Sequence, residues 1–124
     1  MNPRRPSILM REQDWTWGSE ELQDKVEFAI NDVRLTLRKD YPTLRTDWFG
    51  AIGIDPRHLA VWIMTDLDAE RDVIIASDKL NSLIQDSLRQ VNYPAEAISH
   101  ICGTVESQET VDRDWDGKWH HRMK

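Results

Sequence analysis

Residues 59–67, which read LAVWIMTDL, decide the fold of this 124-residue chain. Residues 61–64 are four consecutive apolar residues, which predict a strand in the interior of a sheet or one covered on both faces. The preceding segment 47–54, DWFGAIGI, is also β-like, and the DPRH turn between the two predicts a hairpin. Gly50 and Gly53 weaken that first strand and indicate a bulge or a close backbone approach.

A helix is predicted on each side of this hairpin. Ser19 is placed to cap the first helix, whose apolar residues recur at spacings of three and four until Tyr41-Pro42 ends it. Asp68 is placed to cap a second helix over 69–91, which ends before Pro94 in the same way. Each helix therefore has one apolar stripe with which to cover a sheet.

The remaining segments complete an α+β prediction. Segment 97–107 alternates in hydrophobicity and predicts a third strand, 108–117 is interpreted as a loop or short helical turn, and 118–124 is predicted to be a short terminal strand. The order α-β-β-α-β-β predicts a mainly antiparallel sheet with two helices packed on one face. We expect residues 1–18 to be a flexible arm and 19–124 to be one domain.

Composition and charge restrict the classes of function. Charged residues make up 31% and hydrophobic residues 40%, which is typical of a soluble globular protein. The net charge is −6, and the three arginines of residues 1–11 leave a still more acidic body. An acidic body repels phosphate backbones, so nucleic acid is disfavoured as a partner and a basic protein is favoured.

Location is predicted from what the sequence lacks. No apolar run approaches the ~18 residues of a membrane span, and no apolar region suits a signal peptide. The single Cys102 has no partner for an internal disulfide and is interpreted as a buried thiol in a reducing compartment. We therefore expect a cytoplasmic protein without a membrane partner.

The segment 112–120, DRDWDGKWH, begins like a calcium-binding loop. Asp112, Asp114 and Asp116 alternate, and a glycine follows at the sixth position. The twelfth position of such a loop must supply a bidentate carboxylate, and here it is Met123. We predict that no metal is held here and interpret the segment as an acidic turn between the last two predicted strands.

Other catalytic or metal-binding patterns are weak. His120 and His121 are adjacent, and on a strand they would point to opposite faces, while His58 and His100 follow no zinc spacing. Cys102 lies in no nucleophile motif, and no glycine-rich phosphate loop is present. We predict neither catalytic residues nor a cofactor.

The strongest functional feature is an acidic, tryptophan-containing C-terminal segment. Five acids there are opposed only by Arg113, and the set is Glu106, Glu109, Asp112, Asp114 and Asp116. Trp115 and Trp119 lie within this charged segment, whereas Trp48 and Trp62 are predicted core residues. Acids and indoles together predict a partner-binding surface, and the alternatives are a solvated loop and indoles that fold back onto the sheet.

The C-terminal segment SQETVDRDWDGKW, in a small acidic α+β protein, resembles the immunity proteins of bacterial polymorphic and contact-dependent growth inhibition toxin systems. This resemblance implies a non-enzymatic protein that binds and neutralises a cognate toxin. Many such toxins are nucleases with basic clefts, so the resemblance also implies a basic partner. Two alternatives remain open: a metal-dependent enzyme or metal-binding protein centred on Asp112, Asp114, Asp116 and His120, and a homo-oligomeric structural or phage-derived subunit.

Overall fold

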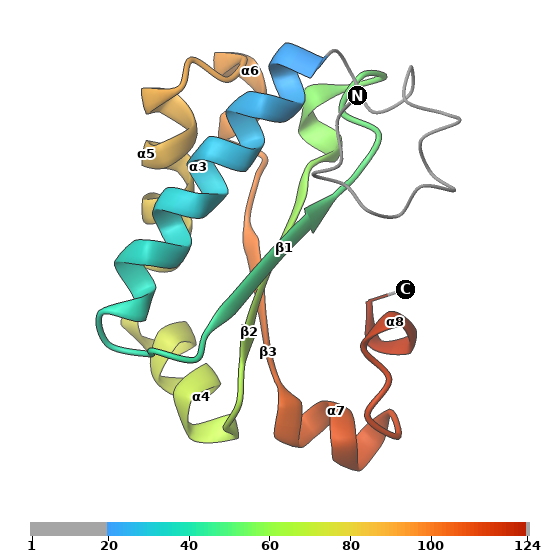
Figure 1. Cartoon of the computed structure of the whole chain (residues 1–124). Coiled ribbons are helices and arrows are strands. Elements are labelled where there is room, and N and C mark those ends of the chain that lie inside the picture. The colour runs from blue at the N-terminus through green and yellow to red at the C-terminus, as the bar shows by residue number, and fades with distance from the viewer. Residues whose placement is uncertain (1–19, 124) are drawn as a thin grey trace.

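The computed structural model describes residues 20–123. The predicted arm 1–18 and the predicted cap Ser19 lie outside the described residues. In chain order the elements are α3 (Glu20–Arg38), β1 (Arg45–Phe49), the 3-10 turn η1 (Pro56–His58), β2 (Ala60–Thr65), α4 (Asp68–Ser77), α5 (Leu80–Gln90), α6 (Ala95–Ile98), β3 (Gly103–Ser107), α7 (Gln108–Asp114) and α8 (Trp119–Arg122) (Figure 1). None of the helices in this part of the chain has the length and apolar character needed to cross a membrane.

The three strands form one mixed sheet in the order β1-β2-β3. β1 and β2 are antiparallel, with Trp48 opposite Val61, so the predicted hairpin is confirmed. β2 and β3 are parallel, with Ile63 opposite Val105. Parallel neighbours need a crossover connection, and α4, α5 and α6 supply it. The α+β class is confirmed, whereas the expectation of a mainly antiparallel sheet is wrong for the β2–β3 pair.

The hairpin connection requires glycine at position 50. Gly50 has a φ of +137°, and a Cβ built there would lie 2.0 Å from the carbonyl oxygen of His58. Only glycine tolerates this combination of backbone angle and close approach. The close backbone approach that the sequence indicated is therefore confirmed at this position.

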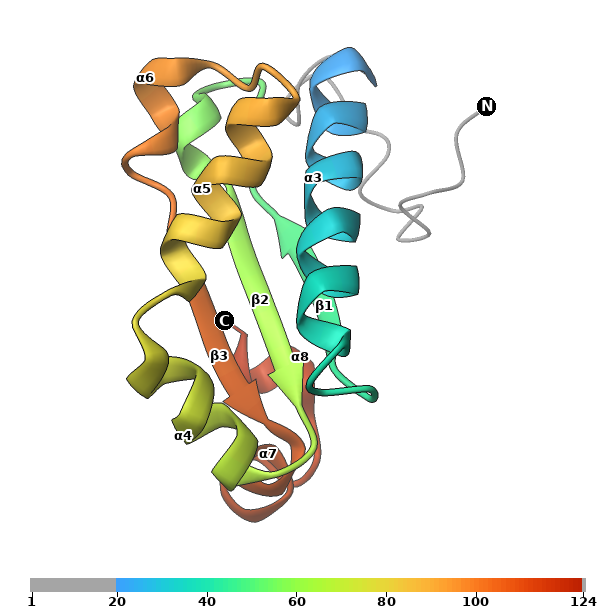
Figure 2. The same ribbon diagram turned by 90° about the vertical axis from the view of Figure 1, so that its left-hand side faces the viewer.

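The helices form a layer on one side of the sheet. α3 and α5 lie side by side over one face, and α4 lies beside the lower part of β3 (Figures 1 and 2). The expected pair of helices becomes three because the predicted helix 69–91 breaks. Asp78 adopts a left-handed conformation with a φ of 59°, which ends α4, and α5 starts at Leu80 in a new direction. Within α4, Val73 is 57% exposed, while Ile74 is buried.

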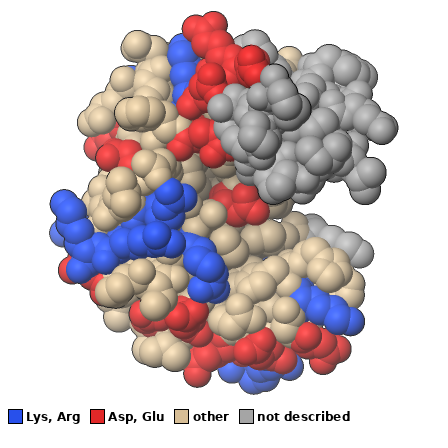
Figure 3. Space-filling model, viewed as in Figure 1, with Lys and Arg blue, Asp and Glu red and all other residues tan. Residues whose placement is uncertain are grey.

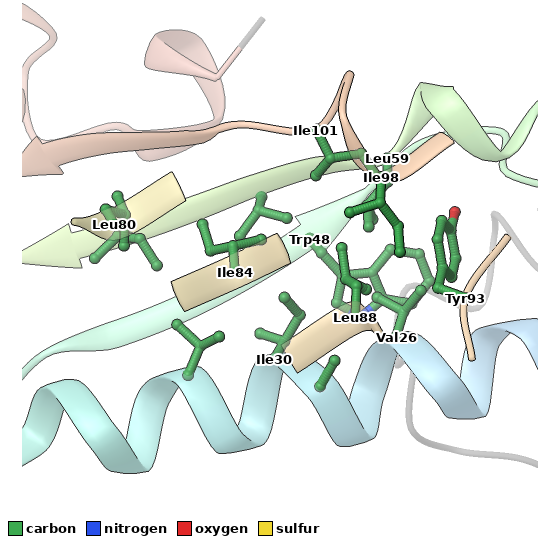
Figure 4. Close-up of a cluster of buried hydrophobic side chains, with 14 of the residues drawn as sticks. Val26, Ile30, Trp48, Leu59, Leu80, Ile84, Leu88, Tyr93, Ile98 and Ile101 are labelled. Carbon is green, nitrogen blue, oxygen red and sulfur yellow. The ribbon is translucent and has the colours of Figure 1, made fainter. Parts of the chain in front are cut away.

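The hydrophobic core fills the space between the sheet and these helices. Trp48 of β1 and Ile84 and Leu88 of α5 point toward Val26 and Ile30 of α3 (Figure 4). All five side chains are at most 3% exposed, so the predicted core position of Trp48 is confirmed. Burial of this kind contributes roughly 1.5–3 kcal/mol for each large apolar side chain, and it is the main stabilising term of the fold.

The chain after α5 departs most from the prediction. Strand β3 is confined to 103–107, and residues before it form α6 and a turn, so Cys102 is exposed and the expected buried thiol is wrong. Segment 108–117, predicted as a loop or a short helical turn, contains the helix α7, because Ser107 caps it by accepting the backbone N–H of Thr110 at 3.1 Å. The predicted terminal strand is the helical turn α8. A fourth strand is therefore absent from the described sheet.

Candidate functional site

The two faces of the sheet differ in character. Val61 and Ile63 point into the core, whereas Trp62 between them points to the other side and lies outside the core cluster. Glu106 pairs in register with Met64 and therefore shares the face of Trp62. We call this the open face, because α3 and α5 cover the opposite one. α8 lies over the open face (Figures 1 and 2).

Glu106 is a buried carboxylate held between two arginines. It is 6% exposed, and its oxygens accept hydrogen bonds from Arg71 Nη1 at 2.9 Å and Arg122 Nε at 2.7 Å. The backbone N–H of Ser107 adds a third bond at 3.0 Å. Burial raises the pKa of Glu106, but the hydrogen bonds from Arg122, Arg71 and Ser107 outweigh it and hold the pKa below its usual value. The carboxylate is therefore ionised and joins α4, β3 and α8.

A second carboxylate, Asp68, organises the start of α4. It accepts hydrogen bonds from the hydroxyls of Ser107 and Thr110, and Arg113 Nη1 lies 3.2 Å from its other oxygen. These bonds, the Ser107 hydroxyl first, lower the pKa of Asp68 to about 2. Thr110 also accepts from Arg71 Nη1 at 2.7 Å, which links the two carboxylate clusters.

These groups meet at the carboxyl ends of the two parallel strands. That position often forms a ligand-binding crevice in sheets with parallel strands, because helix N-termini converge there. Here the chain's own carboxylates take the place of a ligand: Glu109 of α7 accepts the backbone N–H of Asp68 at 2.6 Å. Glu109 also donates its backbone N–H to the carbonyl of Asp66. The arrangement joins the starts of α4 and α7 and supplies acceptors from within the protein for the backbone N–H groups of Asp68 and Glu109.

Trp119 and Arg122 attach the C-terminal turn α8 to earlier elements. Trp119 is half-buried and donates its indole N–H to Gln108 Oε1 at 2.7 Å. Arg122 places its guanidinium carbon 5.2 Å from the ring centroid of Trp62 while its Nε binds Glu106. This combines a cation–π contact with a charge-assisted hydrogen bond. Trp62 is 7% exposed as a result.

The remaining acids of the C-terminal segment are exposed. We define the acidic surface as the exposed side chains of α7 and the following turn: Glu109, Asp112, Asp114, Trp115 and Asp116. Helical spacing puts Glu109 and Asp112 on one side of α7 and Asp114 on another. Trp115 is 39% exposed, so its ring is accessible beside them. Figure 3 shows acidic side chains gathered along the lower edge of the molecule, where Figure 1 places α7.

The turn after α7 is a compact reversal. Asp116 and Gly117 both have positive φ, at 54° and 74°, and the carbonyl of Val111 accepts backbone N–H groups from Trp115 and Gly117. Asp112 folds against the turn and binds Gln108 at 2.9 Å. Within residues 20–123, no three His, Cys, Asp or Glu side chains come together in a way that could hold a metal ion.

The tandem histidines lie on a helical turn and not on a strand. The rings of His120 and His121 stand 4.2 Å apart, centroid to centroid, instead of pointing to opposite faces as the strand prediction required. Both are exposed, as are His58 and His100. The four imidazoles are thus surface groups.

The structure separates the predicted site residues into two sets. Glu109, Asp112, Asp114, Trp115 and Asp116 form the acidic surface, whereas Glu106 is buried on the open face and Trp119 packs against Gln108. Sequence reasoning missed Asp68, Arg71 and Arg122. The spacing of three between Asp68 and Arg71 was a signal for an ion pair, seen at 3.5 Å, but no pattern connects either with residues near the C-terminus.

Sequence reasoning also missed a basic band. Figure 3 shows Lys and Arg side chains grouped over the C-terminal half of α3 and the start of β1. Arg38 donates to the carbonyl of Leu44 at 2.7 Å, and Arg45 pairs with Asp66 at 3.0 Å. These arginines therefore tie the end of α3 and the sheet to neighbouring backbone and acid groups.

Comparisons of this chain with protein-family models, with curated proteins and with solved structures return no significant match.

Proposed function

We propose that this chain is a non-enzymatic binding protein of the immunity type, which attaches to a basic protein toxin through the acidic surface and neutralises it. The observation that carries the proposal is the accessible Trp115 ring among exposed carboxylates at one end of the molecule. A large amphipathic ring supplies apolar contact area, and the surrounding charges select a basic partner and speed encounter.

The ion pairing around α7 supports this role. Arg113 is the one cation within α7, and it is directed toward Asp68 and Asp114 at 3.2 and 3.5 Å. Asp112 binds a neutral amide, and no ion pair to it is seen within residues 20–123. Asp112 and Asp116 thus keep their charge available to a partner. Arg113 offsets part of the negative charge of the acidic surface, which remains negative overall.

The test uses the product of the neighbouring gene as the partner. The chain is co-expressed with that product, and binding is measured by co-purification and by growth rescue if the product is toxic. The variant Asp112→Asn/Asp114→Asn/Asp116→Asn removes three charges from the acidic surface and is expected to weaken binding by roughly ten- to a hundredfold. Loss of rescue should accompany the loss of binding.

The matched control removes three exposed acids elsewhere. Asp40→Asn/Asp86→Asn/Glu96→Gln gives the same change in net charge outside the acidic surface. We expect it to bind and protect like the unmodified chain. Failure of the unmodified chain to bind the neighbouring product at micromolar concentration, or equal weakening by both triple variants, would contradict the proposal.

A further inference from the structure

We propose that Trp62 and Glu106 form a binding recess for an arginine side chain of the basic partner, and that Arg122 of the chain itself fills this recess until the partner arrives. The inference rests on the proposed function, because the arginine is assigned to the same partner. It adds a second contact site, on the open face, to the acidic surface of α7.

The recess has the chemistry of a guanidinium site. The indole of Trp62 forms its floor, and the carboxylate of Glu106 stands at its side, both buried. A guanidinium stacks on the ring and donates to the carboxylate at once, whereas an ammonium is a compact, strongly hydrated charge that stacks poorly. Arg122 makes both contacts in this structure, at 5.2 Å from the ring centroid and 2.7 Å from the carboxylate oxygen.

The site is held in place without Arg122. Arg71 keeps its own bond to the other oxygen of Glu106 and pairs with Asp68. The Ser107 backbone N–H fixes the same carboxylate. Removing Arg122 therefore leaves a carboxylate that is still oriented toward the recess, with one oxygen free to accept a new donor.

The covering segment is weakly attached. α8 has four residues, none of them buried, and a single turn is far below the ~12–15 residues at which isolated helices become stable. The left-handed pair Asp116-Gly117 precedes it and separates it from α7. Trp119 and Arg122 link α8 to earlier elements through Gln108 and Glu106. The turn can thus leave as a unit while β3 and α7 stay in place.

The location favours a protein partner that also meets α7. α8 follows the acidic surface directly in the chain, so a partner on Trp115 and Asp116 lies within a few residues of the segment that covers the recess. The acidic surface and Glu106 are both negatively charged, and both therefore suit a basic partner. Glu106, predicted as a partner contact from the sequence, would become one when α8 moves.

The test first examines the recess without any partner. Nα-acetyl-arginine amide is titrated into the unmodified chain and into Arg122→Ala, and the indole N–H resonance of Trp62 is followed by NMR. We expect a saturable shift in Arg122→Ala with millimolar affinity and roughly tenfold weaker binding of Nα-acetyl-lysine amide. The unmodified chain should shift far less, because its own arginine competes at an effective concentration roughly tenfold above that dissociation constant.

Two further variants make the result specific. Arg89→Ala removes an exposed arginine paired with Asp86 and should behave like the unmodified chain. If Arg122→Ala does not fold, Arg122→Gln serves in its place. No saturable shift in the Arg122 variant, or equal shifts with the arginine and lysine amides, would overturn the proposal.

The final arm uses the neighbouring gene product. Arg122→Ala should bind it roughly tenfold more tightly than the unmodified chain, because the internal competitor is gone. Unchanged or weaker binding would overturn the role of the recess while leaving the acidic-surface variants as an independent test. A dimer of the unmodified chain that Arg122→Ala abolishes would assign the recess to a second copy and likewise overturn the proposal.

Discussion

Replacing Glu106 by glutamine tests the charged network at the carboxyl end of β3. The substitution keeps the size and shape of the side chain and removes its charge. One oxygen remains as an acceptor, but the new amide NH2 is a donor that faces a donor of Arg71 or Arg122. The buried network then holds two guanidinium groups and no carboxylate between them.

The expected loss of stability follows from these contacts. A hydrogen bond to a charged group contributes about 1.5–3 kcal/mol, and the substitution removes the bond from one arginine and weakens the bond from the other. The side chains of Arg71 and Arg122 are 22% and 28% exposed, so water recovers part of the loss. We expect the free energy of unfolding to fall by about 2–4 kcal/mol, which lowers Tm by roughly 10 °C in a domain of this size.

Urea unfolding followed by tryptophan fluorescence measures this loss. The matched control is Glu96→Gln, an exposed glutamate on α6, which should change the unfolding free energy by less than about 0.5 kcal/mol. If Glu106→Gln unfolds at the same urea concentration as Glu96→Gln, the carboxylate does not hold α4, β3 and α8 together and the reasoning fails.

Two further predictions concern the hairpin and acid stability. Gly50→Ala should lower the free energy of unfolding by about 3 kcal/mol or more, because the added Cβ meets the His58 carbonyl at a backbone angle that favours glycine. Thermal unfolding measures this loss, and Gly53→Ala is the matched control. Equal Tm values for the two variants would refute the role of Gly50. Because the pKa of Asp68 is lowered to about 2 in the fold, its ionised form stabilises fully above its ordinary pKa and this stability is lost as pH falls toward 2. Ser107→Ala removes the largest cause of that lowered pKa, so its urea midpoint should fall less between pH 5 and pH 2.5 than that of the unmodified chain; a parallel decline of the two would contradict the assignment.

The local patterns of the sequence predict the first half of the fold well. The apolar run at 61–64 becomes the central strand β2, which has a neighbour on each edge and buries Val61, Trp62 and Ile63. The helix that precedes the hairpin follows its apolar stripe because Val26, Ile30 and Val33 recur at helical spacing. These decisions depend on residues close together in the chain.

The second half depends on contacts that no local pattern contains. The helix predicted over 69–91 breaks because α4 packs beside β3 while α5 packs on α3, and the two directions differ. Segment 118–124 is short and has neither a strong helical nor a strong strand preference, and the bond from Arg122 to Glu106 accompanies its helical turn. Tertiary contacts decide such segments.

The candidate site also divides into residues that local sequence patterns predict and residues that tertiary contacts decide. Exposed acids in a charged helix follow from composition, and Asp112, Asp114 and Asp116 lie on the surface as their neighbours indicate. Glu106 alternates with Val105 and therefore faces away from the core, which alone would predict exposure. Its burial depends on Arg71 and Arg122, which are 35 and 16 residues away in the chain.

The most direct test of the binding role is the association rate constant with the neighbouring gene product, measured by stopped-flow fluorescence at increasing salt. Steering by the acidic surface predicts a rate that falls steeply as ionic strength rises, and a slower, nearly salt-independent rate for Asp112→Asn/Asp114→Asn/Asp116→Asn. The control Asp40→Asn/Asp86→Asn/Glu96→Gln should keep the steep dependence. Equal rates and equal salt dependence for the unmodified chain and the surface variant would contradict the claim that this surface meets a basic partner.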